Sequence, residues 1–340
     1  MAIIDKPSDY FETKLYTGNG GTQSITGLDF QPDWVWIKQR NEVQNHRLVD
    51  SVRGKTKEIF SDLTTAEQTL SNGITAFNSN GFGLGSSNGY NKNSGTYASW
   101  NWKANGAGST NTEGSQNATV SVNTTAGFSI VKFVNVTTAT ANTFGHGLSV
   151  APKVIIMRSL DSAYNWDVYH HKIAISKRLI LNSNSAESSS TYMNSTSPTN
   201  EVFTVKSDEF ANNDDCIAYC FAEKQGFSKF GSYTGNGNAD GTFIYTGFKP
   251  AYVMLKRTDT AGERWNIKDN KRDGYNQTDP VLTADASGAE YDDSQMDLLS
   301  NGFKIRTSAV STNASGGTYI FMAFAENPFV ASNFNAATAR

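Results

Sequence analysis

Three short apolar runs recur along the chain, WVWIK at residues 34–38, VIIMR at 154–158 and YVMLK at 252–256. Successive side chains of a β-strand point to opposite faces, so a run that is apolar at almost every position predicts a central strand covered on both sides. Each run follows a proline and closes on a basic residue. The side chains expected to be almost fully buried are Val35, Ile37, Ile155, Val253, Leu255, Phe303 and Phe324.

The three runs belong to three copies of one longer pattern, which align when Pro32, Pro152 and Pro250 are superimposed. Each run is followed by a short strand-like segment, a second apolar patch, a phenylalanine strand and an aromatic closing strand. The strand-like segments are HRLVD at 46–50, WDVYH at 166–170 and WNIKD at 265–269. Repetition on this scale predicts the architecture. We expect an all-β protein of three tandem β-sandwich repeats, jelly-roll or lectin-like, each of about 100 residues.

The pattern also predicts where the repeats begin and end. The expected parts are an N-terminal arm at 1–14, repeat 1 at 15–103, a linker at 104–125, repeat 2 at 126–226, repeat 3 at 227–329 and a C-terminal tail at 330–340. The segment 104–125 is rich in Gly, Ser, Asn and Thr, which favours a linker or a long surface loop. Only Gly226 separates repeats 2 and 3, so we expect those two to pack together and repeat 1 to be better separated.

Three shorter segments carry weaker expectations. The arm, with Pro7 and the pair Tyr10–Phe11, reads as an exposed segment that docks elsewhere. Residues 63–72 (LTTAEQTLSN) are the best candidate for a helix, and less than about 10 per cent of the chain is expected to be helical. In the tail, Phe334 is the one side chain that could act as an anchor.

Composition excludes several classes of protein. The net charge is −3, from 29 basic and 32 acidic residues, with no basic cluster, so nothing indicates binding to nucleic acid or to an anionic membrane. No apolar run approaches the roughly 20 residues that span a bilayer. The N-terminal sequence lacks the features of a signal peptide, and we expect a soluble protein that is not exported by that route.

The two cysteines, Cys216 and Cys220, lie on one predicted strand. Four residues along a strand span roughly 13 Å. A disulfide requires Cα atoms about 4.4–6.8 Å apart, so these cysteines cannot pair while the strand is intact. We expect both to be buried as small hydrophobic residues.

Histidines and glycine-rich turns are the first candidates for chemistry. The GNGG and GNGNADG runs lack the lysine and the helix of a phosphate-binding loop. His170 and His171 are adjacent on a strand and face opposite sides, so they are poorly placed to share a metal with Asp161 or Asp167. A solvated strand end is the favoured reading. In the alignment of the repeats, His170 stands where the other copies carry Asp50 and Asp269.

Acidic residues are the second candidates. The pairs Asp214–Asp215 and Asp292–Asp293 read as solvated turns, with calcium binding as the alternative. Glycoside hydrolysis needs two carboxylates on one cleft. The acids that recur between copies, Asp50 with Asp269 and Glu223 with Glu326, stand at strand ends without such a pairing. We therefore assign no catalytic, cofactor or metal residue, expect no cofactor, and leave the ligand-binding residues unknown.

Exposed aromatic side chains could instead stack on a glycan. Most of the candidates fall in alternating strand patterns, however, which favours packing in the core or between repeats. The candidates are Tyr16, Tyr233, Trp100, Trp102, Trp166 and Trp265.

Several long strings carry a resemblance to a known repeat family. SDYFETKLYTGNG at 8–20, GFSKFGSYTGNGNADGTFIYTGFKPAYVMLKRTD at 226–259 and GTYIFMAFAENPF at 317–329 resemble repeats of unassigned biochemical function in virion-associated and tail fibre proteins of marine tailed bacteriophages, including those of cyanobacteria. The resemblance covers nearly the whole chain and is weaker in repeat 2. It implies a virion location and supplies neither a ligand nor a catalytic residue.

Two functions follow as expectations. The first is a non-enzymatic bacteriophage structural protein on the particle surface, as a tail fibre, appendage or capsid decoration, contributing to host attachment after assembly in the bacterial cytoplasm. Its expected partners are other phage structural proteins, further copies of itself with a trimer as one option, and a host surface glycan, without nucleic acid or membrane insertion. The alternative is a receptor-recognition module that binds or cleaves carbohydrate.

Overall fold

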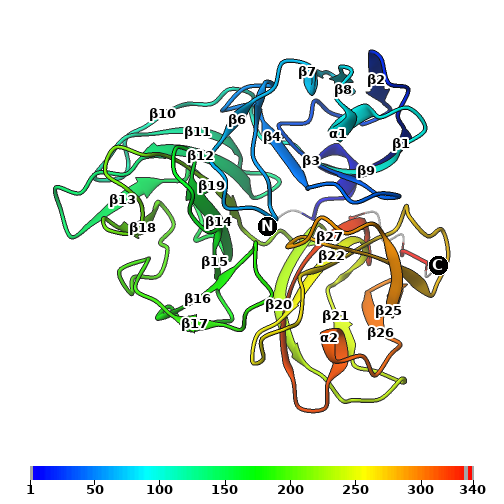
Figure 1. The fold of residues 1–340 in the computed structure, drawn as a ribbon. Helices are drawn as coiled ribbons and strands as arrows, with labels where there is room; N and C mark the ends of the chain where they lie inside the picture. The colour runs from blue at the N-terminus through cyan, green and yellow to red at the C-terminus, as the bar shows by residue number, and fades with distance from the viewer. Residues whose placement is uncertain (1–2, 333–335, 339–340) are drawn as a thin grey trace.

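The computed structural model describes residues 3–332 and 336–338, and antiparallel strands dominate it (Figure 1). The strands form three lobes, which we define by their residues: lobe 1 is 11–102, lobe 2 is 109–221 and lobe 3 is 228–328. In Figure 1 they run from blue to cyan, through green, and from yellow-green to red. Within the described residues, no sheet combines strands of two lobes. The expectation of an all-β sandwich fold is confirmed.

The elements of lobe 1 and the segment before it are η1 Pro7–Asp9, β1 Phe11–Thr17, β2 Gln23–Thr26, β3 Trp34–Gln39, β4 Arg47–Asp50, β5 Lys57–Glu58, β6 Gln68–Thr69, β7 Ile74–Asn78, β8 Gly81–Leu84, α1 Asn88–Asn91 and β9 Thr96–Trp102. Those of lobe 2 are β10 Ser109–Asn111, β11 Ala118–Asn123, β12 Phe128–Val134, β13 Ala141–Gly145, β14 Val154–Ser159, β15 Asp167–His170, β16 Lys177–Ile180, β17 Ser188–Ser189, β18 Val202–Lys206 and β19 Asp215–Phe221. Those of lobe 3 are β20 Ser228–Thr234, β21 Phe243–Tyr245, β22 Phe248–Arg257, β23 Asn266–Asp269, β24 Thr278–Thr283, β25 Tyr291–Leu299, β26 Gly302–Ile305, α2 Val310–Asn313 and β27 Thr318–Pro328.

Each lobe contains the same order of four neighbouring strands, which we call its inner sheet. The orders are β1-β9-β3-β4, β12-β19-β14-β15 and β20-β27-β22-β23. The pairing is also equivalent, because Trp36 faces Trp100, Ile156 faces Tyr219 and Met254 faces Met322. A second layer of strands (β2-β8-β7, β13-β18 and β21-β26-β25) lies over one face of each inner sheet. The three apolar runs of the sequence are therefore the third strands of the inner sheets.

The alternation of side chains along these strands serves two different cores. One face points into the lobe's own sandwich, through Val35 and Ile37, Ile155 and Met157, and Val253 and Leu255. The other face points to a central core shared by all three lobes, through Trp34 and Trp36, Val154 and Ile156, and Tyr252 and Met254. All seven side chains predicted to be almost fully buried are at most 1% exposed.

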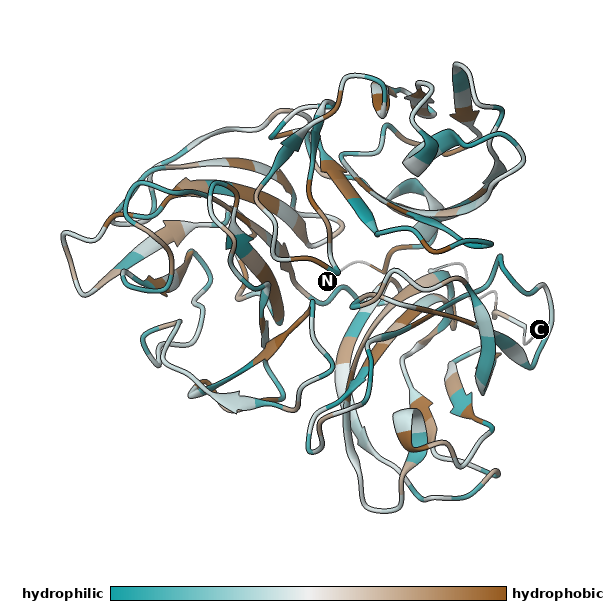
Figure 2. Ribbon diagram, in the orientation of Figure 1, coloured by the Kyte–Doolittle hydropathy of each residue, from teal (hydrophilic) through white to brown (hydrophobic). Residues whose placement is uncertain are grey.

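The central core joins lobe 1 to the other two lobes through aromatic contacts. The ring of Trp34 stacks on Tyr219 at 4.2 Å between centroids, and Phe11 lies 5.7 Å from Tyr252. In Figure 2 many of the hydrophobic segments lie along the inner-sheet strands. The expectation that repeat 1 stands apart is therefore wrong. Each inner sheet has a second apolar face that its own lobe leaves uncovered. The three lobes bury these faces against one another in the central core.

The segment predicted to be a linker is instead the edge of a sheet. Within 104–125, β10 pairs with β11 and β11 pairs with β12, with Val120 opposite Val131. The polar composition hid an alternation in which Ala118 and Val120 point into the core of lobe 2. A strand at a sheet edge needs only this sparse apolar face, because its other face is solvated.

The N-terminal arm is also placed differently from its prediction. Ile4 is buried in the central core, its N–H donates to the carbonyl of Gln225, and Phe11 opens β1. The arm therefore docks on its own chain. Phe334 lies outside the described residues, although Ser332 of the tail donates its N–H to Asp5 at 2.7 Å.

The expected helix at 63–72 is absent, and this segment contains the short strand β6. The two α-helices of the described residues, α1 and α2, are four residues each and were not predicted. Low helical content was predicted correctly. None of the described helices is long and apolar enough to cross a membrane.

Candidate functional site

The first recurring acid, Asp50, lies at the end of β4 and is buried where lobe 1 meets lobe 2. Its Oδ2 pairs with Arg53 Nε at 2.5 Å and accepts a hydrogen bond from the hydroxyl of Tyr219 at 2.8 Å. The N–H groups of Val52 and Arg53 donate to its Oδ1. The carboxylate is therefore fully used in holding a turn and a lobe interface.

The second recurring acid, Asp269, makes the same arrangement where lobe 3 meets lobe 1. It pairs with Arg272 Nε at 2.6 Å and accepts a hydrogen bond from the indole N–H of Trp100 at 3.1 Å. Burial alone would raise the pKa of Asp269, but the charge of Arg272 and the donated hydrogen bonds lower it. The group is held as a carboxylate inside the protein.

His170 occupies the equivalent position in lobe 2. It pairs in register with Val154, as Asp50 does with Trp34 and Asp269 does with Tyr252. Its Nε2 lies 3.2 Å from the carbonyl oxygen of Phe321 in lobe 3, and its Nδ1 accepts the N–H of Lys172. Burial lowers the pKa of His170 to about 3, so the ring is neutral. The predicted solvated strand end is wrong, because the contact with Phe321 buries it.

Together these contacts form a closed ring. Lobe 1 reaches lobe 2 through Asp50, lobe 2 reaches lobe 3 through His170, and lobe 3 reaches lobe 1 through Asp269. A second set runs in the opposite sense: the indole of Trp166 donates to the carbonyl of Phe60, and that of Trp265 to the carbonyl of Ile180. The strand-end position occupied by Asp50, His170 and Asp269 therefore holds the lobes together.

The aromatic residues considered for glycan stacking are packing residues. Trp100, Trp102, Trp166 and Trp265 are all buried in the central core. The other two stack inside single lobes, Tyr16 on Tyr97 at 4.9 Å and Tyr233 on Tyr319 at 4.8 Å. The packing interpretation is the one that the structure supports. Cys216 and Cys220 are buried and unpaired, as predicted.

Five of the other candidate acids, Asp214, Asp215, Glu223, Asp293 and Glu326, have local partners. Asp214 accepts a hydrogen bond from the hydroxyl of Ser159, and Asp293 accepts one from the hydroxyl of Ser294. The other three acids each pair with a lysine. These are Asp215 with Lys132, Glu223 with Lys229 and Glu326 with Lys249. Within residues 3–332 and 336–338, no group of three or more His, Cys, Asp or Glu side chains is arranged to hold a metal ion.

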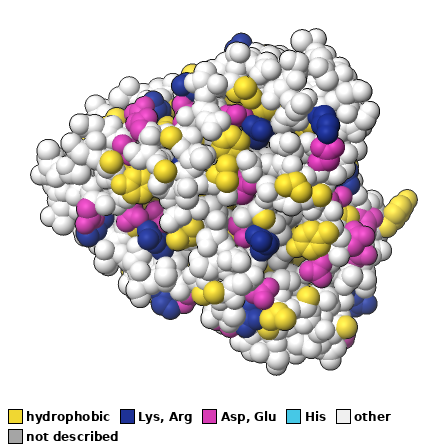
Figure 3. Space-filling view, in the orientation of Figure 1, with side chains coloured by type: hydrophobic (Ala, Val, Ile, Leu, Met, Phe, Trp, Pro, Cys, Tyr) yellow, Lys and Arg dark blue, Asp and Glu magenta, His cyan; other side chains and the backbone are white. Residues whose placement is uncertain are grey.

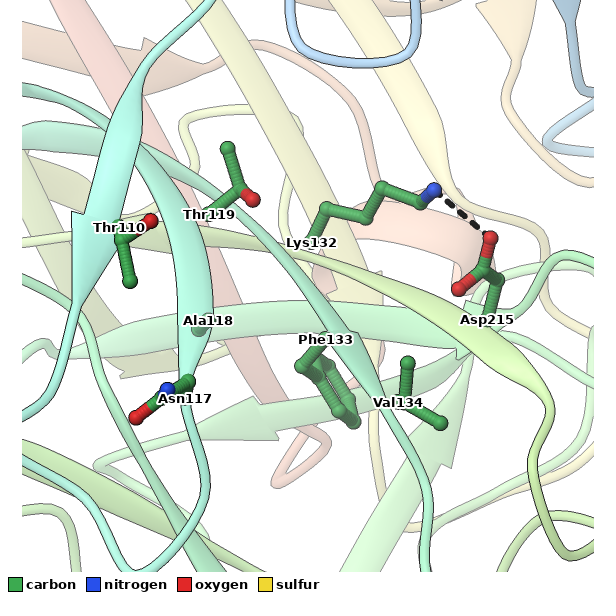
Figure 4. A pocket seen from close by; sticks show the side chains of 8 residues that line it. All are labelled: Thr110, Asn117, Ala118, Thr119, Lys132, Phe133, Val134 and Asp215. Carbon is green, nitrogen blue, oxygen red and sulfur yellow. Dashed lines mark ion pairs between the residues drawn. The ribbon is translucent and has the colours of Figure 1, made fainter.

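The visible surface has no patch of one charge. On the face shown in Figure 3, basic, acidic and hydrophobic side chains are interspersed among other polar groups. One recess of about 310 Å³ opens on lobe 2 beside β11 and β12, where Lys132 Nζ pairs with Asp215 Oδ2 at 2.7 Å (Figure 4). Because this cation and anion satisfy each other, the recess presents little free chemistry.

A groove of about 420 Å³ on lobe 3 has a different lining. It lies between the loop 262–264, the first residue of β23, the start of β25 and the start of α2. Its polar residues are Glu263, Arg264, Asn266 and Asp293, and its aromatic wall is Tyr291, which is 45% exposed. Asn266 is buried, and within the part of the chain that the structure describes its Nδ2 has no hydrogen-bond partner.

A family model described as Domain of unknown function (DUF7483) matches residues 6–328. The chain belongs to this DUF7483 family. The single match spans all three lobes, which agrees with their shared central core. No curated protein and no solved structure matches the chain.

Sequence reasoning missed the groove of this DUF7483 protein. Asn266 sits in the segment WNIKD, where it looks like a polar position of an ordinary strand. The available signal was a difference between the repeats. The position of Asn266 is occupied by Arg47 in lobe 1 and by Asp167 in lobe 2. The three are equivalent because each pairs in register with the same position of the third inner-sheet strand, which is Leu255, Ile37 and Met157 respectively. A position that is charged in two copies and neutral in the third marks a local change of role.

Proposed function

We propose that this DUF7483 protein is a non-enzymatic structural protein of a bacteriophage virion. It sits on the particle surface, as part of a tail fibre or appendage or as a capsid decoration, and contributes to host attachment. Its three lobes are copies of one repeat unit. The resemblance of its repeats to those of marine phage virion proteins supports the location.

The observation that carries the structural role is the closed ring of buried interlobe contacts. Asp50, Asp269 and His170 stand at one equivalent position in the three lobes, and each binds a neighbouring lobe. A position that serves contacts between lobes in all three copies favours a scaffold over a repeated catalytic site. Catalytic acids, by contrast, need access to substrate at a cleft.

The expected partners are other phage structural proteins and further copies of this chain, with a host surface glycan as the attachment target. Mixed and mildly acidic surface charge supports contacts that do not depend on polyanions such as nucleic acid. Burial of the apolar inner-sheet faces within one chain leaves the outer loops for such contacts.

The proposal is tested on particles released from cultures that carry the gene. Antibody raised against the recombinant protein should label intact purified particles in electron microscopy, and mass spectrometry of those particles should find the chain at a copy number typical of structural components. Absence of the chain from particles that contain their other structural proteins would contradict the location. Release of reducing sugars from host polysaccharide by the pure protein would contradict the non-enzymatic role.

A further inference from the structure

We propose that a second copy of this chain binds at the free edge of β21 in lobe 3, with the two β21 strands paired antiparallel about a two-fold axis. β21 is the last strand of its sheet and lies next to β26. Within residues 3–332 and 336–338, no segment pairs with its other side. The inference goes beyond the proposed function, because it rests on this edge and not on a virion location.

The first support is the direction of the backbone groups of β21. Thr246 donates its N–H to the carbonyl of Asn301, at the start of β26. Hydrogen-bonded positions alternate along an antiparallel pair, so Thr246 and Ile244 face β26. The N–H and C=O groups of Phe243 and Tyr245 therefore point away from the sheet. These two residues offer two donors and two acceptors to an incoming strand.

Lobe 2 has an equivalent edge strand, β13. The two strands correspond because each places one residue opposite the phenylalanine of its phenylalanine strand, Phe144 opposite Phe203 and Ile244 opposite Phe303. The residue before this position has its backbone groups on the free edge, and in lobe 2 it is Thr143. The contacts of Thr143 therefore show what this edge of the repeat can bind.

The second support is that the edge in lobe 2 is already occupied by an extended segment. Gln116 donates its N–H to the carbonyl of Thr143 at 3.2 Å, and the N–H of Thr143 donates to the hydroxyl of Ser115 at 2.9 Å. This segment belongs to the stretch 104–125, which precedes the inner sheet of lobe 2. Only residues 222–227 separate lobe 3 from lobe 2, so a strand for the edge of lobe 3 has to come from another chain.

The third support is the side chains that the edge of lobe 3 presents. Phe243 is 45% exposed and Tyr245 is 60% exposed. In lobe 1 the equivalent positions flank Ile25 and are Ser24 and Thr26. Exposed apolar side chains on a free sheet edge favour pairing with another strand, whereas hydroxyl side chains keep an edge hydrated. Of the three equivalent edges, that of lobe 3 combines free backbone groups with aromatic rings.

The sequence of β21 selects a second copy as the occupant. A two-fold axis at Ile244 requires the antiparallel arrangement, although the segment on lobe 2 runs parallel to β13. The axis brings Phe243 opposite Tyr245 of the second copy, so each of the two pairs exchanges two N–H···O hydrogen bonds. Each pair also places a phenylalanine ring beside a tyrosine ring, a combination that stabilises paired strands.

The residues around β21 fit this symmetric pair. Gly302 pairs in register with Tyr245 and has no side chain, which leaves room for the rings. Lys304 pairs in register with Phe243, and its amine already has Asp240 as a counter-ion. The lysines of two copies therefore do not repel each other strongly. Since only three residues of each chain pair, the dimer should dissociate on dilution, as small interfaces do.

Sedimentation velocity of the full chain over a dilution series tests the pairing. The wild type should convert from monomer to dimer as its concentration rises toward about 1 mM, the range of weak association. Phe243→Ser/Tyr245→Thr gives lobe 3 the side chains of lobe 1 and should raise the dissociation constant by roughly tenfold or more. Tyr291→Thr is the matched control, because Tyr291 is as exposed as Phe243 but lies on β25, which is paired on both sides.

Phe243→Pro tests the backbone contacts separately. The N–H of Phe243 points away from β26, so proline removes no hydrogen bond of the fold and blocks a bond between the copies. Hydrogen–deuterium exchange locates the contact. The amides of Phe243 and Tyr245 should exchange more slowly as the wild-type concentration rises, and those of Ser24 and Thr26 should not change. Thermal melting checks that each variant is folded.

Should Phe243→Pro fail to fold, Phe243→Ser/Tyr245→Thr decides the result, since both side chains lie on the surface. A wild type that stays monomeric up to about 1 mM would overturn the proposal. A dimer that is unchanged in the double variant, that is lost equally in Tyr291→Thr, or that leaves exchange at β21 unchanged would overturn it too. None of these results depends on particle incorporation, so the pairing and the proposed function can fail separately.

Discussion

The hydroxyl of Tyr219 in lobe 2 donates a hydrogen bond to Asp50 Oδ2 in lobe 1 across 2.8 Å, with both residues fully buried. The same carboxylate neutralises Arg53, whose Nη2 donates to the carbonyl of Leu48. One contact between lobes therefore completes a network that begins as a local turn. Removing the partner lobe would leave a buried charge pair short of a hydrogen bond and open to water.

Tyr219→Phe should lower the free energy of unfolding by about 1–3 kcal/mol, because it removes a buried hydrogen bond to a charged group and keeps the ring that stacks on Trp34. Urea melts followed by tryptophan fluorescence measure this. Tyr275→Phe, at an exposed position, is the control and should change stability by less than about 0.5 kcal/mol. Equal melting midpoints for Tyr219→Phe and wild type would mean that this bond contributes nothing to the interface.

Phe11→Ala should cost about 3–5 kcal/mol, as expected for a large ring removed from a packed core. Phe11 contacts Trp102 of its own lobe and Tyr252 and Phe324 of lobe 3. Phe243→Ala, at a ring that is 45% exposed, serves as the control. A loss below about 1 kcal/mol in Phe11→Ala would show that the N-terminal segment is peripheral, as the sequence had suggested.

Leu255→Ala should cost about 2–5 kcal/mol, because Leu255 points into the sandwich of lobe 3 from the middle of its inner sheet. The matched control is Leu15→Ala, since Leu15 is partly exposed on β1. Chemical denaturation again provides the measurement. A Leu255→Ala protein as stable as Leu15→Ala would mean that β22 is not a central strand.

Stability should fall in acid partly through His170. Burial lowers its pKa to about 3 in the folded protein, whereas an unfolded histidine titrates near 6.5. Between these values the unfolded chain binds a proton that the folded chain does not, so the contribution of His170 is fully present above about pH 6.5 and is lost as the pH falls.

The variant His170→Gln isolates this effect, because glutamine does not titrate. The stability of wild type relative to His170→Gln should drop by about 1.4 kcal/mol for each pH unit below 6.5. Urea melts between pH 8 and pH 4.5 give both curves. A difference between the two proteins that stays constant over this range would contradict a buried neutral His170.

The parts of the fold that were predictable are those with a strong period-two pattern. Val35, Ile155 and Val253 were recognised as buried because they lie in runs that are apolar on both faces. Those runs do not reveal which face of the strand packs on the second sheet and which packs on another lobe. Trp34 and Val35 are both apolar, and the sequence does not distinguish their two environments. Strands β10 and β11 were missed because an edge strand needs few apolar residues.

The lobe 3 groove was hidden for a different reason. At the groove, Asn266 has no ion-pair partner within the described residues, whereas Arg47 pairs with Glu58 and Asp167 pairs with Arg178. The absence of a contact produces no recognisable sequence motif. The fate of Asp50 and Asp269 was equally out of reach. A carboxylate at a strand end looks the same in sequence whether it faces water or an indole from another lobe.

The central claim is that three lobes share one core and form a single body. Differential scanning calorimetry of the full chain tests this most directly, because 340 residues in independent domains would unfold in separate steps. The shared core predicts one transition whose calorimetric and van 't Hoff enthalpies agree, and a Tyr219→Phe protein whose whole transition moves to lower temperature. Two or more separable transitions, with only one of them shifted by Tyr219→Phe, would contradict it.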